Sequence, residues 1–192
     1  MITPLISAPG GRVLATAELR QDKPDRRDFA ALPRQPITVL LDRVTGNYNI
    51  GAIFRLCDAF RVERLVIAGT TVDLRKRRLV QAAQGTQHWV PWVQINDAVS
   101  FVGNVKAAGA WVVVAEQTTG SFGPQQLMPA VPACLILGSE KTGVLQDIVE
   151  LADAAVAIPM LGMANSINVA SSAAILMHWL SRSCPPQTVA AD

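Results

Sequence analysis

The stretch IPMLGMANSINVASSAAILMHWL, from Ile158 to Leu180, decides how the rest of the chain is interpreted. Between Ala154 and Ser181 the sequence has no Asp, Glu, Lys or Arg, and an uncharged run of this length is compatible with a membrane-spanning helix. Pro159 and Gly162 interrupt the run early, however, and several Asn and Ser residues follow them. Polar groups at this density are costly in lipid. The stretch therefore predicts a short strand, a polar turn and an apolar helix within a globular domain.

The composition indicates one compact domain rather than a disordered chain. Of the 192 residues, 50% are apolar and only 17% are charged, which is sufficient for a sizeable core. The net charge of +2 is too small to indicate a nucleic-acid partner by itself. The N-terminus lacks a basic segment followed by an apolar one, so we expect no signal peptide.

Cysteine and histidine usage argues against disulfides and metal sites. Cys57, Cys134 and Cys184 are far apart, odd in number and form no CxxC pair. This usage suits a reducing compartment, so we expect a cytoplasmic protein without a disulfide framework or a zinc site. His88 and His178 alone are too few for a histidine-rich centre, and we predict no metal.

Strand and helix patterns alternate from Pro36 onward. We predict an irregular N-terminal arm at 1–35 with a short helix near 13–20, a folded domain at 36–182 and a frayed tail at 183–192. Short β-rich runs predict strands at 37–41, 64–68, 89–95, 111–115, 134–137 and 154–160. Helical patterns occupy 50–60, 97–108, 144–152 and 166–180. Pro91 indicates that the third strand is either an edge strand or an irregular one. The alternation predicts an α/β fold with a mostly parallel sheet flanked by helices.

Unusual residues follow three of the predicted strands, where ligands bind in an open α/β sheet. These segments are 45–49, 138–140 and 159–166. None contains GxGxxG, GxxxxGK[ST] or GxSxG. The missing motifs disfavour a Rossmann dinucleotide site, a phosphate-binding loop and an esterase nucleophile elbow. They also disfavour a small-molecule nucleotide-binding protein.

Each polar residue in these segments also has a purely structural interpretation. Asn49 precedes an amphipathic helix and suits its N-cap. Arg55 is either a surface arginine in a salt bridge or a clamp for phosphate or carboxylate. Glu140 is compatible with a cap for the following helix or a surface pair with Lys141, and Asn168 with a satisfied polar residue in a helix turn. Their joint occurrence favours a shared site.

Three segments together resemble a known enzyme family. In chain order they are NYNIGAIFRLCDAF (47–60), LILGSEKTG (135–143) and IPMLGMANSINV (158–169). They resemble the three motifs of the SpoU/TrmH branch of the SPOUT RNA methyltransferases, and EKTG followed by IPMLGM is particularly similar to the tRNA-modifying members. The resemblance implies a C-terminal trefoil knot, a homodimer, S-adenosylmethionine as cofactor and methylation of a ribose 2′-hydroxyl in RNA, with tRNA favoured over rRNA.

The resemblance also assigns roles to individual residues. It implies a catalytic role for Asn49, Arg55, Glu140 and Asn168. Arginine stays protonated in proteins, so Arg55 is better suited to grip a phosphate and stabilise an alkoxide than to act as a base. The implied cofactor-binding residues are Gln117, Thr118, Leu137, Gly138, Ile158, Met160, Ser166 and Ile167.

Two further expectations concern partners. The basic cluster Arg75, Lys76, Arg77 and Arg78 suits phosphate contacts with RNA, although a solvated helix start explains it equally simply. The last helix is apolar on nearly every face, which favours burial against a second subunit.

The alternatives to a tRNA methyltransferase are an rRNA 2′-O-methyltransferase of the same family and a non-catalytic RNA-binding relative. Neither a membrane nor a metal is an expected partner.

Overall fold

The computed structural model describes residues 12–21, 23, 29, 32–128 and 130–182. The chain divides into two compact units, Met1–Leu32 and Pro33–Asp192. In the first unit the predicted helix near 13–20 is reduced to a 3-10 turn, η1 (Glu18–Arg20). The Glu18 carboxylate accepts from the Ala15 N–H at 2.7 Å and pairs with Arg12. The predicted tail, which includes Cys184, lies outside the described residues.

The second unit is built on a six-stranded sheet in the order β3-β2-β1-β5-β4-β6. Every pairing between these strands is parallel. The strands are β1 (Gln35–Asp42), β2 (Val62–Ala68), β3 (Trp92–Ile95), β4 (Trp111–Ala115), β5 (Ala133–Gly138) and β6 (Ala154–Val156). The prediction of a mostly parallel sheet is confirmed, and β3 lies at an edge as Pro91 indicated.

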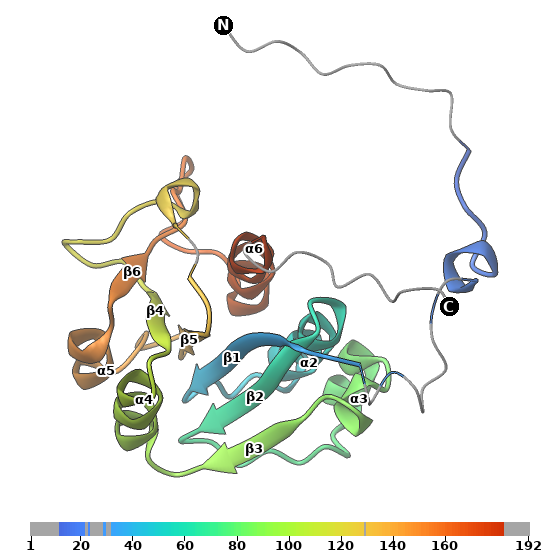
Figure 1. Ribbon diagram of the computed structural model, residues 1–192, viewed down its shortest axis with the longest axis horizontal. Helices are drawn as coiled ribbons and strands as arrows, with labels where there is room; N and C mark the ends of the chain where they lie inside the picture. The colour runs from blue at the N-terminus through green and yellow to red at the C-terminus, as the bar shows by residue number, and fades with distance from the viewer. Residues whose placement is uncertain (1–11, 22, 24–28, 30–31, 129, 183–192) are drawn as a thin grey trace, which may run out of the picture. The chain divides into compact units, whose positions relative to one another are not determined.

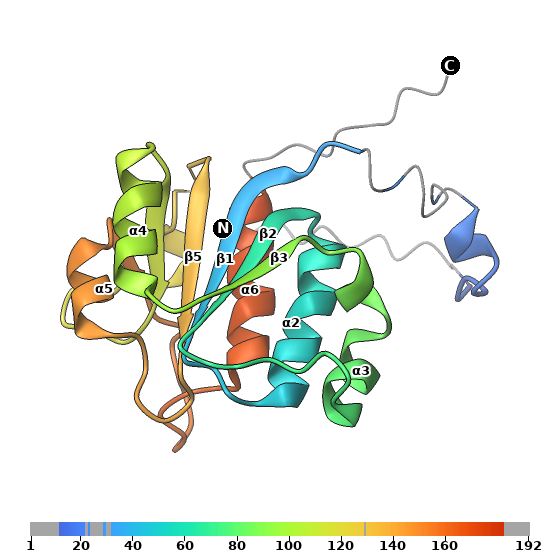
Figure 2. The same ribbon diagram turned by 90° about the horizontal axis from the view of Figure 1, so that it is seen from below.

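Helices cover both faces of the sheet (Figures 1 and 2). One face carries α2 (Asn47–Ala59), α3 (Arg77–Ala83) and α6 (Val169–Ser181). The other face carries α4 (Ala98–Ala107) and α5 (Gln146–Leu151). Two 3-10 turns, η2 (Thr86–His88) and η3 (Pro124–Gln126), lie in the connections.

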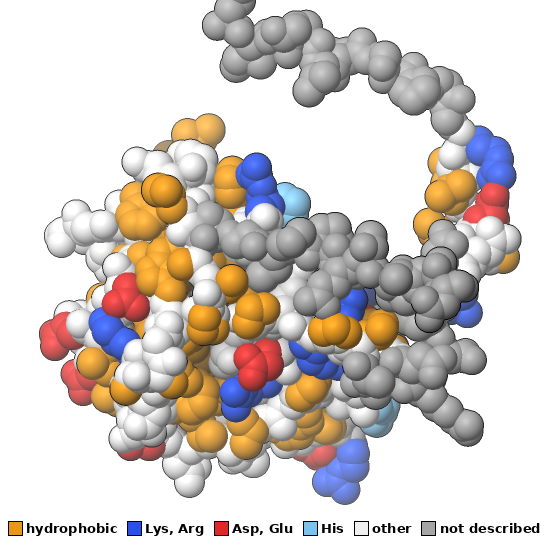
Figure 3. Space-filling model, viewed as in Figure 1, with side chains coloured by type: hydrophobic (Ala, Val, Ile, Leu, Met, Phe, Trp, Pro, Cys, Tyr) orange, Lys and Arg blue, Asp and Glu red, His pale blue; other side chains and the backbone are white. Residues whose placement is uncertain are grey.

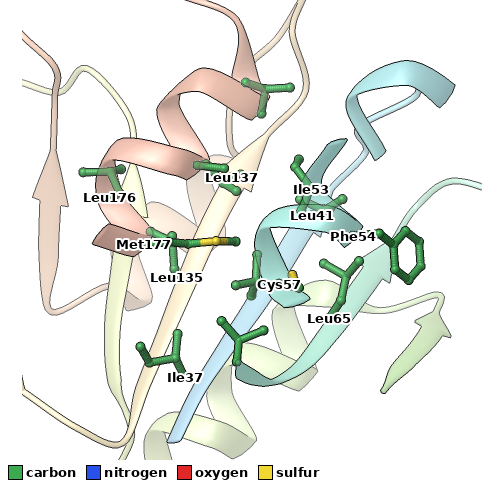
Figure 4. Packing of buried hydrophobic residues seen from close by; sticks show 14 of the residues in the cluster. Ile37, Leu41, Ile53, Phe54, Cys57, Leu65, Leu135, Leu137, Leu176 and Met177 are labelled. Atoms are coloured by element: carbon green, nitrogen blue, oxygen red, sulfur yellow. The ribbon is translucent and has the colours of Figure 1, made fainter. Parts of the chain in front are cut away.

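The central strands are largely apolar because both of their faces are covered. In β1, Ile37, Val39 and Leu41 point toward α2 and α6, whereas Leu40 points toward α4 and α5. Figure 4 shows the hydrophobic cluster on the α2 and α6 face of the sheet, where β5 packs under α6 and β1 packs under α2. Each large side chain buried here stabilises the fold by about 1.5–3 kcal/mol.

Several element boundaries differ from the predictions. The last strand ends at Val156 rather than at 160, and the last helix begins at Val169 rather than at 166. Pro159 has no N–H to donate to a strand ladder, which disfavours a longer strand. Residues 157–168, between β6 and α6, form a loop instead. The uncharged run is thus divided into three short pieces. Within the described part of the chain, no helix combines the length and apolarity that crossing a bilayer requires.

The strand order places a switch point between β1 and β5. From β1 the chain passes through α2 to β2 on one side, and from β5 it passes through α5 to β6 on the other. Ligands bind at such a reversal, outside the carboxyl ends of the strands. Asp42 and Gly138 are register partners at these two strand ends, so the fold predicts a ligand site at this edge.

Candidate active site

A pocket of about 430 Å³ lies at the carboxyl edge of the sheet. The loops after β4, β5 and β6 form most of its wall, and the start of α6 closes one side. These loops gather at the lower edge of the sheet in Figure 2. The residues that line the pocket include Glu116, Gln117, Leu137, Gly138, Ser139, Glu140, Lys141, Ile158, Met160, Ser166, Ile167 and Asn168.

One chain of side-chain hydrogen bonds joins the three sequence motifs. Asn49 Nδ2 donates to Glu140 Oε1 at 2.7 Å. Asn168 Nδ2 in turn donates to Asn49 Oδ1 at 2.9 Å. The side-chain oxygen of Asn168, Oδ1, accepts from the backbone N–H groups of Ala170 and Ser171 at 2.9 and 3.4 Å. The three motifs therefore meet through specific atoms.

This geometry corrects two structural interpretations and extends a third. Asn49 is not an N-cap, because α2 begins at Asn47 and Gly46 occupies its cap position. Glu140 caps no helix, since α5 begins at Gln146, and the described residues contain no Glu140–Lys141 ion pair. Asn168 does cap α6, and the same side chain also reaches Asn49.

A second network holds the loop after β5, and the sequence analysis missed its members. Asp42 is buried, with 1% of its surface exposed, and its Oδ2 accepts from the Leu145 N–H at 2.9 Å. Arg43, with a positive φ of 56°, donates to the Gly143 carbonyl at 3.0 Å and to both oxygens of Asp42 at 3.1 Å. The sequence did contain one signal for this network: Asp42 is an acidic residue at the end of a buried strand, at the edge of the sheet where ligands bind.

Two glycines allow this loop to fold closely on itself. A Cβ on Gly138 would lie 2.3 Å from the backbone of Gly143, far inside van der Waals contact. Gly143 has a φ of +66°, which favours glycine, and a Cβ there would lie 2.2 Å from Glu116 Oε2. The Gly143 N–H closes the turn by donating to the Ser139 carbonyl at 2.9 Å.

The structure brings together most of the predicted cofactor residues. Seven of them line the pocket: Gln117, Leu137, Gly138, Ile158, Met160, Ser166 and Ile167. Gln117 Nε2 also donates to the Asn165 carbonyl at 2.5 Å, which joins the loop after β4 to the loop after β6. Thr118 is not part of the lining, and its backbone bonds to Ser121 instead.

Arg55 lies apart from this pocket. Its side chain is exposed on α2, it does not line the pocket, and within the described residues it forms no hydrogen bond or ion pair. The basic cluster is exposed as well. Arg75 pairs with Asp73 at 2.9 Å, while Arg77 and Arg78 begin α3, which packs against α2.

Exposed apolar side chains occur beside the pocket. Leu161 and Met163, both in the loop after β6, are fully exposed. Figure 3 shows hydrophobic side chains on the surface in the region where Figure 1 places this loop. In α6, Val169, Ala173, Leu176, Met177 and Leu180 are buried within the unit, whereas Ile175 and Trp179 are only half-buried.

The fold is that of a parallel α/β domain with a pocket at a switch point of the sheet, where Asn49 of α2 joins the loop after β5 to the start of α6. The sequence matches the SpoU rRNA Methylase family over residues 36–178. The chain belongs to this family.

Its relatives include enzymes named for both tRNA and rRNA. The chain is 29% identical over 150 residues to the tRNA (guanosine(18)-2'-O)-methyltransferase of Escherichia coli K12, covering 78% of this chain and 65% of that protein. It is 33% identical over 143 residues to the 23S rRNA (guanosine(2553)-2'-O)-methyltransferase of Bacillus subtilis, covering 74% of this chain and 56% of that protein. The chain thus spans somewhat less than two thirds of the length of these relatives.

Solved structures share the fold. The TrmH/SpoU tRNA modifying enzyme of A. aeolicus has a TM-score of 0.71 and 29% identity, covering 80% of this chain and 78% of that one. An AdoMet-bound rRNA methyltransferase from Sinorhizobium meliloti has a TM-score of 0.72 and 28% identity, covering 81% of this chain and 60% of that one.

Proposed function

We propose that this protein transfers a methyl group from S-adenosylmethionine to a ribose 2′-hydroxyl in RNA. The observation that carries the proposal is the hydrogen-bond chain Glu140–Asn49–Asn168 at the rim of the pocket. It fixes one residue from each of the three motifs in a single arrangement. The relatives named above as 2'-O-methyltransferases give the same reaction class.

The pocket fits an adenosyl cofactor in size and chemistry. Its volume of about 430 Å³ lies in the range of small-ligand sites, roughly 300–1,000 Å³. Leu137, Val156 and Leu176 supply apolar walls for a flat base. The backbone N–H groups of Ile158 and Met160 have no protein partner within the described residues, so they remain available to the edge of an adenine. When bound, the cofactor supplies an activated sulfonium methyl group.

The protein's task is to align the ribose oxygen and remove its proton. Asn49, held between Glu140 and Asn168, orients the ribose. Glu140 Oε1 accepts from Asn49, and Glu140 Oε2 is the atom that receives the ribose proton. Arg55 stays protonated, grips the neighbouring phosphate and stabilises the negative charge that develops on the ribose oxygen. Its exposure outside the pocket suits a residue that acts once RNA is bound.

The remaining RNA contacts come from the cluster Arg75–Arg78. Lys76, Arg77 and Arg78 are exposed at the start of α3, where they can approach a phosphate backbone. Contacts of this kind give affinity that falls with salt and reads little sequence. We therefore propose that this cluster determines affinity and leaves the choice of nucleotide to the pocket.

The proposal also includes a homodimer, a C-terminal trefoil knot and a cytoplasmic location. Incomplete burial of Ile175 and Trp179 on α6 supports the dimer, and the family resemblance supports the knot. Sedimentation that shows a folded monomer at micromolar concentration would overturn the dimer. An experimental structure traced through 133–181 tests the knot, and cell fractionation tests the location.

We favour tRNA as the substrate, and the B. subtilis relative supports rRNA as a second candidate. Purified tRNA and rRNA should be incubated with the protein and methyl-labelled cofactor, and the modified nucleotide then mapped. Label in a tRNA ribose supports the first candidate, and label in rRNA supports the second. If neither RNA is labelled and calorimetry detects no S-adenosylmethionine binding, the result favours the third candidate, a non-catalytic RNA-binding relative.

A further inference from the structure

Glu116 is an acidic side chain of the pocket wall that the proposed reaction does not use. It follows β4 directly and is half-buried. Its Oε1 accepts from the Gln117 N–H at 2.9 Å, and its Oε2 accepts from the Val144 N–H at 2.9 Å. Two backbone donors thus fix both oxygens of the carboxylate.

The carboxylate keeps capacity for further donors. An ionised carboxylate has about four lone-pair sites, and the two backbone bonds occupy only half of them. Lys141 lines the same pocket, but the described residues contain no ion pair between Lys141 and Glu116. A carboxylate without a cationic partner in a small pocket favours a ligand that brings hydrogen-bond donors.

Its position in the sheet identifies which part of a ligand it would meet. Strand β4 lies between β5 and β6, so Glu116 lies between the loop at Gly138 and the loop at Ile158–Met160. If an adenine lies against Ile158–Met160, the next group along the ligand toward Gly138 is the ribose. A ribose presents two adjacent hydroxyls, and a carboxylate at a strand end is suited to accept from them.

Gly143 shows how closely the loop after β5 holds this carboxylate. A Cβ at position 143 would lie 2.2 Å from Glu116 Oε2. The loop after β5 therefore lies so close to the carboxylate that only glycine fits at position 143. This approach holds the carboxylate in one place, as selective binding of a diol requires.

We propose that Glu116 binds the 2′- and 3′-hydroxyls of the cofactor's ribose and makes the pocket selective for ribonucleosides over deoxyribonucleosides. This inference rests on the proposed function, because it takes the pocket as the adenosyl site. It adds a specificity residue from outside the three motifs.

The test compares ligands that differ only in these hydroxyls. Calorimetry on the full chain would measure binding of S-adenosylhomocysteine and of its 2′-deoxy and 3′-deoxy forms. For the native protein we expect each deoxy form to bind roughly ten-fold more weakly, since hydrogen bonds to charged groups are strong. In Glu116→Gln, which keeps the side-chain shape, the parent ligand should weaken roughly ten-fold and the ribo/deoxy ratio should fall to about two.

The possible outcomes distinguish a failure of the Glu116 inference from a failure of the proposed methyltransferase function. If Glu116→Gln and Glu116→Ala weaken all ligands alike and keep the native ratio, Glu116 only shapes the loops and the inference is wrong. It is also wrong if Glu116→Gln weakens S-adenosylmethionine but not S-adenosylhomocysteine, since the carboxylate would then bind the positive charge. If the native protein binds none of these ligands, the proposed function itself fails. Glu150→Gln, an exposed change on α5, is the matched control and should keep both affinity and ratio.

Discussion

Asn49 and Glu140 are separated by 91 residues in the chain, yet Asn49 Nδ2 donates to Glu140 Oε1 at 2.7 Å. Asn49 occupies the first turn of α2, after β1, and Glu140 occupies the loop after β5. Because β1 and β5 are neighbouring parallel strands, both loops leave the sheet at the same edge. The bond thus depends on the strand order, and it joins two motifs that are far apart in sequence.

Replacement of Asn49 by Ala should reduce methyl transfer roughly 100-fold, because the ribose loses the group that orients it. The cost in free energy of unfolding should be only about 1 kcal/mol, since Asn49 is half-buried. Labelled-cofactor assays and thermal melts would measure the two effects. Asn47→Ala is the matched control, two residues earlier in the same helix. Equal activity in the two variants would remove Asn49 from the site.

Asn168 should show two separable functions. Asn168→Asp keeps the oxygen that caps α6 but removes the N–H donor to Asn49, so we expect near-native stability and a loss of activity of at least ten-fold. Asn168→Ala should lose activity and also about 1 kcal/mol of stability, because the cap is gone. Melting temperature and methyl transfer should be measured on the same samples. An active Asp variant would leave Asn168 with a capping role alone.

Arg55 should affect activity without affecting stability. Its side chain is exposed, so Arg55→Ala should change the free energy of unfolding by no more than about 0.5 kcal/mol. Methyl transfer should nevertheless be abolished, and Arg55→Lys, which keeps the charge but loses the guanidinium fork, should restore only part of it. Arg64→Ala, at another exposed arginine, is the control. Full methylation by Arg55→Ala with normal RNA binding would refute the catalytic role.

The sequence predicted the six strands and the helices α2, α4, α5 and α6 in the right order, because hydrophobic periodicity and the residues at strand ends are local signals. It did not predict the short helix α3. It did not predict which of Asn49 and Asn168 would cap its helix. Asn suits an N-cap equally well at either helix start, and only the tertiary structure decides that Gly46 caps α2 while Asn168 caps α6. Local preference cannot distinguish them, because the deciding bond runs between helices.

The residues that sequence reasoning missed act through backbone groups. Asp42, Arg43 and Glu116 each bond to the main chain of 143–145, and a backbone partner has no side-chain signature in the sequence. The resemblance covers three motifs and assigns roles only to residues within or near them. The network that holds the loop of the second motif lies outside all three, and only the geometry of the folded chain shows it.

The thiols of Cys57 and Cys134 should resist alkylation in the native protein. Both are buried and free, and burial raises the pKa of each thiol, to about 12 for Cys134. The reactive species is the thiolate, which a raised pKa suppresses at pH 8. Iodoacetamide at pH 8 followed by mass spectrometry should show both residues unmodified in the native protein and modified after unfolding. Rapid native modification would contradict their burial.

Asp42 should be the residue of the second network whose loss costs most. Its buried carboxylate accepts from the Leu145 N–H and from Arg43, so Asp42→Ala leaves a backbone donor and a guanidinium group without their partner. We expect a loss of about 3 kcal/mol in the free energy of unfolding and a melting temperature lower by roughly 6–12 °C.

The same change should weaken cofactor binding, because the loop after β5, which carries Glu140, loses the hydrogen bond from the Leu145 N–H to Asp42. Calorimetry with S-adenosylmethionine, performed well below the melting temperature, would separate this effect from unfolding. Asp147→Ala removes an exposed carboxylate from the first turn of α5 and should cost no more than about 1 kcal/mol, with affinity unchanged. If Asp42→Ala is destabilised yet binds the cofactor as tightly as Asp147→Ala, the network stabilises the sheet edge without positioning the loop.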